Sequence, residues 1–156
     1  MIDNVALASN YRMTAVVFWE SAKRLHGSFE TSGESVIGNR MAVPFYFLVS
    51  HSAELLLKCA LLKRGVDQRE LLKHGVRHDL RELLTEITSK GIPVTVNTAE
   101  IITRLADQHR QHALRYTVLV EDGEVTFTPD PLTLCDALDE LLMLGAYLLM
   151  AFKYWL

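Results

Sequence analysis

Apolar residues recur every three or four positions along the first 26 residues, which is the spacing that places them on one side of an α-helix. We therefore predict an amphipathic helix over residues 4–26, ended by Gly27, whose apolar side is formed by Ala8, Tyr11, Ala15, Phe18, Ala22 and Leu25. Residues 27–40 contain three glycines and several hydroxyl side chains without a period. That composition is typical of a loop.

The next stretch, residues 41–64, is apolar on all sides except for one polar stripe. Pro44 suits a first helical turn, and Gly65 suits the position just after the last turn. Because a helix that is apolar all round is buried, we predict that this is the central helix of the fold.

The polar stripe consists of His51, Glu54 and Lys58, at positions i, i+3 and i+7 of that helix. Such spacing places the three side chains on one face. We predict that Glu54 is buried and ionised and that it pairs with Lys58 or His51. We also predict that His78 with Asp79, or Arg115 with Tyr116, comes close enough to complete its hydrogen bonds. A structural cluster is one interpretation of the stripe, and acid–base machinery is the other.

Three shorter helices are predicted by cap residues that are each followed three positions later by a glutamate, which is capping-box spacing. The pairs are Asp67 with Glu70, Asp79 with Glu82, and Asn97 with Glu100. The second helix should end at Gly91 and Pro93, and the third should continue to about Ala113, with His109 on its apolar side.

Two alternating stretches, residues 116–120 and 124–128, flank Asp122 and Gly123, a strong hairpin signal. Asp130 as a cap and Pro131 in the first turn then begin a last helix that should reach about Trp155. The sequence thus predicts an all-α protein with a single domain over residues 1–156. Its architecture would be an up-and-down bundle of about five helices, with one small β-hairpin before the last helix.

Composition limits the functional classes. The chain has 156 residues and a net charge of −3, so any affinity for nucleic acid must come from a local patch. Its two cysteines, Cys59 and Cys135, lie in apolar helical runs and suggest neither a disulfide framework nor a metal site. We expect a cytoplasmic protein without a signal peptide or a membrane span, since the uncharged run 141–152 is too short to cross a bilayer.

Three motifs in this order resemble the HEPN domain family of small bacterial and archaeal helical proteins. They are HSAELLLKCALLKRG at residues 51–65, HGVRHDLRELLTEITSKG at 74–91 and ALRY at 113–116. The resemblance covers roughly residues 40–150, and its residues are His51, Glu54, Lys58, His78, Asp79, Arg115 and Tyr116. It implies a helical bundle that often forms a homodimer. Many members are metal-independent ribonucleases of toxin–antitoxin or defence systems, and others bind nucleotides or act as non-catalytic partners.

Active members of that family carry an arginine followed, after four to six residues, by a histidine. Arg104 with His109 and Arg69 with His74 both match, although Leu105 and Glu70 replace the small polar residue that usually follows the arginine. In the catalytic interpretation, His109 moves the proton of an RNA 2′-hydroxyl while Arg104 holds the phosphate. In the alternative, Arg104 is solvated and His109 has a local structural role. Residues five apart on a regular helix point about 140° apart, so a second protomer would have to contribute.

A metal site at His74, His78 and Asp79 is the weaker alternative, because Gly75 interrupts the helix that two histidine ligands would share. We expect no cofactor. Two functional classes remain: an RNA-cleaving or nucleotide-binding domain, for which an antitoxin-type protein partner is expected, and a non-catalytic homodimeric interaction module. A basic groove containing Arg104, Arg110 and Arg115 would favour the first class. The apolar side chains of the last helix, such as Met143 and Leu144, predict the homodimer in both.

Overall fold

The computed structural model describes residues 4–32, 42–73, 76–110 and 129–153, with side chains described except at 29–32, 107–110 and 146–153. These residues form six helices and no strand: α1 (Asn4–Ser32), α2 (Ala42–Lys63), α3 (Gln68–Leu71), α4 (Leu80–Ser89), α5 (Val96–Arg110) and α6 (Pro131–Lys153). The predicted all-α class is confirmed. The predicted hairpin at 116–128 lies outside the described residues.

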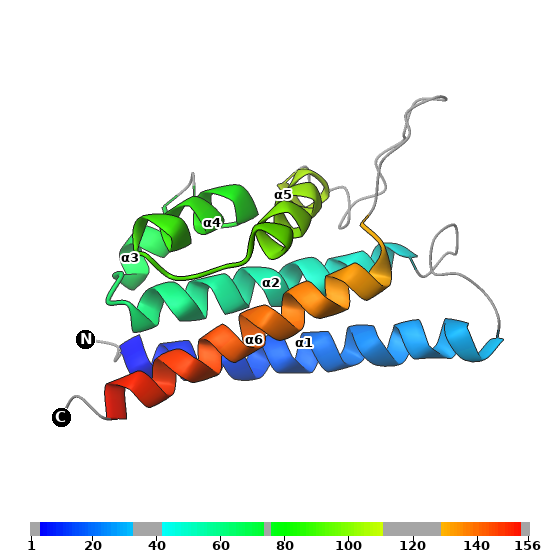
Figure 1. Cartoon of the computed structure of the whole chain (residues 1–156), viewed down its shortest axis with the longest axis horizontal. Helices are drawn as coiled ribbons and strands as arrows, with labels where there is room; N and C mark the ends of the chain where they lie inside the picture. The colour runs from blue at the N-terminus through cyan, green and yellow to red at the C-terminus, as the bar shows by residue number, and fades with distance from the viewer. Residues whose placement is uncertain (1–3, 33–41, 74–75, 111–128, 154–156) are drawn as a thin grey trace.

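The long helices α1, α2 and α6 lie lengthwise along the molecule, with α3, α4 and α5 on the other side of α2 (Figure 1). α2 and α6 run in the same direction and α1 runs against both (Figure 1). The predicted up-and-down order is therefore not kept along the whole chain. The reason is that the segment from α3 to α5 carries the chain back to the end at which α2 began.

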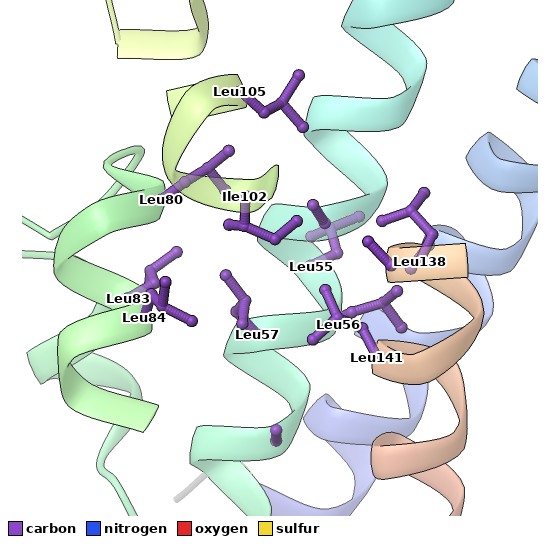
Figure 2. Packing of buried hydrophobic residues seen from close by; sticks show 14 of the residues in the cluster. Leu55, Leu56, Leu57, Leu80, Leu83, Leu84, Ile102, Leu105, Leu138 and Leu141 are labelled. Atoms are coloured by element: carbon purple, nitrogen blue, oxygen red, sulfur yellow. The ribbon is translucent and has the colours of Figure 1, made fainter. Parts of the chain in front are cut away.

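The predicted central position of α2 is confirmed, since α2 packs against α1, α4, α5 and α6. Every residue from Ser52 to Lys63 is buried. Consecutive residues of a helix point about 100° apart, so neighbouring leucines reach different partners. Leu57 lies on the side of α4, and Leu56 lies on the side of α6 near Leu141 (Figure 2).

The ends of α2 and α4 follow the glycine signals in the sequence. Gly65 and Gly91 adopt positive φ angles of 84° and 64°, a conformation that glycine reaches without a steric penalty. After α2, the amide of Gly65 donates to the carbonyl of Leu62 and the amide of Val66 donates to that of Leu61. These two bonds form a Schellman motif, and the same pattern closes α4.

The predicted end of the first helix at Gly27 is wrong, because α1 continues to Ser32. Gly27 is not among the glycines with positive φ, so its backbone does not break the helix there. A glycine inside a helix costs only about 1 kcal/mol relative to alanine. The hydroxyl of Ser28, which donates to the carbonyl of Leu25 at 2.7 Å, is part of this continued helix.

Three of the predicted helix starts are confirmed, and one is displaced. The side chains of Asp67, Asp79 and Asp130 accept hydrogen bonds from backbone amides at the starts of α3, α4 and α6. At α5 the cap is Thr95 instead of Asn97, since the Thr95 hydroxyl accepts from the amide of Thr98 at 3.2 Å.

Candidate functional site

Glu54 and Lys58 form a buried ion pair in the middle of α2. Their relative exposures are 1% and 5%, and the Lys58 ammonium lies 2.6 Å from the Glu54 Oε1 atom. Lys58 also donates to the carbonyl of Arg77 at 2.5 Å. The predicted burial of Glu54 and its pairing with Lys58 are confirmed, because each charge has a hydrogen-bonded partner inside the fold.

Two histidines complete this group, which we call the Glu54 cluster (His51, Glu54, Lys58 and His78). The Nδ1 atom of His78 lies 3.1 Å from Oε1 of Glu54, and the Nδ1 atom of His51 lies 3.9 Å from Oε2. An ionised carboxylate can only accept hydrogen bonds, so His78 donates from Nδ1. The side chains of His78 and His51 are 35% and 25% exposed, so the two imidazoles connect the buried carboxylate to the surface.

The position of His78 is fixed from both sides by its neighbours in the chain. On one side, the carbonyl of Arg77 accepts the hydrogen bond from Lys58. On the other, Asp79 caps α4 by accepting from the amides of Arg81 at 3.0 Å and Glu82 at 3.4 Å. A short turn held at both ends thus brings His78 to Glu54, which is 24 residues earlier in the chain.

Aromatic rings surround His51 at the surface end of the cluster. The ring of Phe18 in α1 meets His51 edge to face, with centroids 4.7 Å apart. Phe47 lies one helical turn before His51, with a centroid distance of 5.9 Å and an interplanar angle of 7°. Both phenylalanines are partly exposed, so the cluster has an aromatic border on this side.

A run of exposed basic residues adjoins this cluster along the chain. Residues 64–81 contain five basic and three acidic residues, a net charge of +2 with histidine neutral, whereas the whole chain has −3. We call residues 64–81 the basic segment. All five of its cations are exposed on the surface: Arg64, Arg69, Lys73, Arg77 and Arg81. Arg77 and Arg81 flank His78 in the chain, so the excess positive charge borders the exposed imidazole.

Arg104 and His109 are both positions of α5, and only the side chain of Arg104 lies within the described part of the chain. Arg104 is half exposed and pairs with Glu100 on its own helix. Because α5 is helical from Val96 to Arg110, residues 104 and 109 point about 140° apart. The side chains of His109 and Arg110, and all of Arg115 and Tyr116, lie outside the described residues.

The second arginine–histidine match is likewise incomplete. Arg69 is exposed in α3, and His74 lies outside the described residues. Within the part of the chain that the structure describes, no three histidine, cysteine or acidic residues form a set of metal ligands.

A separate pocket of about 370 Å³ lies beside α3, lined by the turn after α2 and by the last turn of α4. Its charged residues are three carboxylates and two amines: Asp67, Glu70, Glu86, Lys73 and Lys90. Glu70 and Lys73 pair with each other. The pocket contains no residue of the Glu54 cluster.

Two polar side chains that join distant parts of the fold were not predicted from the sequence. Glu140 of α6 accepts from the amide of Thr95 at 2.8 Å and from the hydroxyls of Thr95 and Thr98, at 2.7 and 2.5 Å. Burial raises the pKa of Glu140, but these hydrogen bonds outweigh that effect and leave the pKa below its ordinary value. Glu140 thereby joins the start of α5 to α6. Because the two residues in contact are 45 residues apart in the chain, no local sequence pattern predicts the contact.

The other unpredicted group is Lys63, which is 8% exposed at the end of α2. Its ammonium donates to the carbonyl of Gly145 in α6. Burial lowers the pKa of Lys63, hydrogen bonding with the Cys59 thiol partly opposes this, and Arg12 lowers the pKa further. Burial raises the pKa of the Cys59 thiol in turn.

α2 is also the one helix in the described part of the chain that is long and apolar enough, by length and composition, to cross a membrane. Its most apolar window is 83% buried inside the fold. That burial is the arrangement of a core helix.

Comparison with known proteins gives no match: no family model, no curated protein and no solved structure is similar to this chain. The resemblance to HEPN domains stays a prediction that rests on the motifs quoted above.

Proposed function

We propose that this protein is a HEPN-like domain that binds RNA and, as a homodimer, cleaves it without a metal ion. The observation that supports the proposal is the reversal of charge in the basic segment. A chain with a net charge of −3 has a local charge of +2 in the exposed residues that flank the partly exposed imidazole of His78 in the chain. Such a patch attracts a phosphate backbone, and that attraction supplies most of non-specific nucleic-acid affinity.

The Glu54 cluster supports the family part of the proposal. The resemblance rests on His51, Glu54 and Lys58 in one motif and on His78 and Asp79 in the next. In the folded chain, His78 lies 3.1 Å from Glu54, so residues of the two motifs meet at one carboxylate. Shared motifs that form one hydrogen-bonded unit are better support than the same residues scattered over the surface.

Cleavage would use Arg104 and His109 as the resemblance implies, with Arg104 on the phosphate and His109 on the proton of the 2′-hydroxyl. The 140° between the two positions on α5 favours a site completed by a second copy of the chain. An exposed apolar surface is available for that contact: Val5, Met13 and Val17 of α1 and Met143 of α6 are all more than half exposed. Apolar side chains so placed favour association.

The test is an incubation of the purified protein with mixed RNA in the presence of EDTA. Arg104→Ala and His109→Ala should each lower the cleavage rate at least about 100-fold, the size of effect expected when one electrostatic or proton-transfer group is lost. Arg24→Ala removes an exposed cation from α1 and serves as the matched control. Cleavage that persists in His109→Ala, or that requires a metal ion, would contradict the proposal.

A second candidate is a non-catalytic homodimeric interaction module, favoured by the same exposed residues of α1 and α6. It predicts a dimer mass in light scattering together with no RNA cleavage and no RNA binding. A monomer at micromolar concentration would contradict both candidates. The expected cytoplasmic location, absence of a cofactor and antitoxin-type partner belong to the first proposal and stay predictions.

A further inference from the structure

We propose that Lys63 is a site of reversible carbamylation, in which its side-chain amine takes up carbon dioxide and Arg12 holds the carbamate that forms. One bond is made, between Nζ and the carbon of CO2, so that the amine (R–NH2) becomes a carbamate (R–NH–COO⁻). The displaced amine proton leaves to solvent, and neither an oxidant nor a reductant is involved. This inference goes beyond the proposed function and is independent of it, because it requires no RNA.

The surroundings of Lys63 come from three helices. Lys63 is buried at the end of α2, which lies beside the beginning of α1 and the later turns of α6 (Figure 1). α6 contributes the carbonyl of Gly145, which accepts a hydrogen bond from Nζ. α2 contributes the Cys59 thiol, one turn earlier, and α1 contributes the Arg12 guanidinium. In the described part of the chain, these are the titratable groups that act on the amine, and none of them is a carboxylate.

The first argument is that this environment favours the uncharged amine, which is the form of lysine that reacts with CO2. Burial lowers the pKa of Lys63, the Cys59 thiol partly opposes this, and the cation of Arg12 lowers the pKa further. A lysine that is desolvated and lies near another cation is activated as a nucleophile in this way. Lys58 has the Glu54 carboxylate as its partner at 2.6 Å and therefore lacks this environment.

The second argument is a buried donor on Arg12 that has no acceptor. The Nε atom of Arg12 is buried and makes no hydrogen bond in the described part of the chain. Buried N–H groups in proteins almost always have a partner, so this donor indicates that the site can accommodate a further acceptor. A carbamate on Lys63 would supply it, because two anionic oxygens would enter a site that otherwise has two basic side chains.

The third argument is the space beside Gly145. A Cβ atom added there would lie 3.7 Å from Cδ and 3.8 Å from Nε of Arg12, which is ordinary van der Waals contact, and no other described atom would come within 4 Å. Because glycine has no side chain, this position next to Nε is open to an atom of a ligand. The carbonyl of the same glycine accepts from Lys63. A carbamate can therefore bridge towards Arg12, while its remaining N–H keeps the bond to Gly145.

The burial of the site selects the modifier. Lys63 is only 8% exposed, which excludes the bulky reagents that modify surface lysines. Carbon dioxide is an uncharged molecule of three atoms and can enter where such reagents cannot. Arg12 is partly exposed although its Nε atom is buried, so its side chain borders both solvent and the site. Movement of this one flexible side chain would admit CO2 and release the proton.

The experiment incubates the purified protein with ¹³C-labelled bicarbonate at about pH 8 and constant ionic strength, and records the ¹³C NMR spectrum. A carbamate carbon gives a resonance separate from those of bicarbonate and CO2. Wild type should show a carbamate resonance that Lys63→Met abolishes. Lys90→Met removes an exposed lysine and is the matched control that should retain the resonance. The N-terminal amine also reacts with CO2, and its signal is recognised because both variants keep it.

A second pair of variants tests the role of Arg12. Arg12→Gln should weaken the uptake of CO2 at least about tenfold, because the carbamate loses a hydrogen bond from a charged donor. Arg24→Gln removes an exposed cation from α1 and should leave the uptake unchanged. Bicarbonate should also raise the urea midpoint of wild type and not that of Lys63→Met, since a ligand that binds the folded state stabilises it. A thermal melt confirms that each variant is folded.

The site of modification can also be located without any variant. Triethyloxonium traps a carbamate as its ethyl ester, and mass spectrometry of digested wild type should find that ester on Lys63. Absence of the ester from Lys63 would overturn the proposal, whatever the variants show. An ester on Lys63 whose formation Arg12→Gln does not weaken would overturn the role of Arg12. Both results leave the proposed RNA cleavage untouched, because the test contains no RNA.

Discussion

Lys58 and Lys63 lie five residues apart on α2 and are both buried, yet their electrostatic surroundings are opposite. Lys58 faces the Glu54 carboxylate at 2.6 Å. Lys63 faces the carbonyl of Gly145 and the Cys59 thiol, with the cation of Arg12 nearby and no carboxylate within ion-pair distance in the described part of the chain. Five residues correspond to about 140° of helix rotation, so one lysine is turned towards α4 and the other towards α6. The comparison teaches that the partner of a buried lysine, more than its burial, decides how the lysine contributes to the stability of the fold.

The largest effect is expected where a buried charge loses its partner. Glu54→Ala should lower the free energy of unfolding by about 3 to 5 kcal/mol, because it removes packing and leaves the Lys58 ammonium buried without a counter-ion. Glu54→Gln should cost less, since the amide keeps the shape and part of the hydrogen bonding. Urea unfolding measures both variants. A Glu54→Ala variant within about 0.5 kcal/mol of wild type would show that the ion pair does not stabilise the fold.

Replacing each lysine by methionine tests the comparison directly, because the same change is made twice on one helix. Lys58→Met should cost about 3 kcal/mol, since it leaves Glu54 buried and charged. Lys63→Met should change stability by less than about 1.5 kcal/mol, because methionine has a similar length and no charge is left behind. Urea unfolding at pH 7 compares the two. Equal losses would mean that the two sites do not differ as described.

The part of the fold that could be predicted from the sequence is the part that depends on neighbours in the chain. Asp67, Asp79 and Asp130 accept hydrogen bonds from backbone amides that follow two or three residues later. Gly65 and Gly91 end helices because their own backbone adopts a positive φ angle. Each of these helix-start and helix-end signals is contained within a few consecutive residues of the sequence. The predicted helix end at Gly27 was wrong because the sequence does not distinguish a glycine with helical φ from one with positive φ.

The contacts that could not be predicted join distant segments. Glu140 reaches Thr95 across 45 residues, and Lys63 reaches a backbone carbonyl of Gly145 across 82. Every residue has a backbone carbonyl, so the sequence does not indicate which carbonyl accepts the hydrogen bond from Lys63. The meeting of Glu54 and His78 was expected only through the family motifs. The periodicity of α2 by itself places Glu54 on a polar stripe but does not predict which residue of another segment pairs with it.

The pH dependence of stability sharpens the difference between the lysines. Because the pKa of Lys63 is lowered in the folded protein, the folded state binds fewer protons than the unfolded state between that pKa and about 10.4, the ordinary value. Wild-type stability should therefore rise with pH in this window, and the stability contributed by a neutral Lys63 is lost as pH falls through the lowered pKa. Urea unfolding of wild type and Lys63→Met at pH 7 and pH 9 gives the difference. Parallel pH profiles would show that Lys63 does not titrate abnormally.

The smallest effect is expected for an ion pair that lies at the surface with both side chains about half exposed. Arg104 pairs with Glu100 one turn away on α5, and their side chains are 47% and 58% exposed. An exposed pair at this spacing contributes about 0.3 to 0.5 kcal/mol, because water and salt screen the charges and two long side chains lose rotational freedom. Arg104→Ala should therefore leave the free energy of unfolding within about 0.5 kcal/mol of wild type in urea. If RNA cleavage falls in the same variant, the loss belongs to the missing guanidinium and not to unfolding. A large loss of stability instead would place Arg104 with the buried charges, and the catalytic test would then require Arg104→Lys, which keeps the charge while changing its geometry.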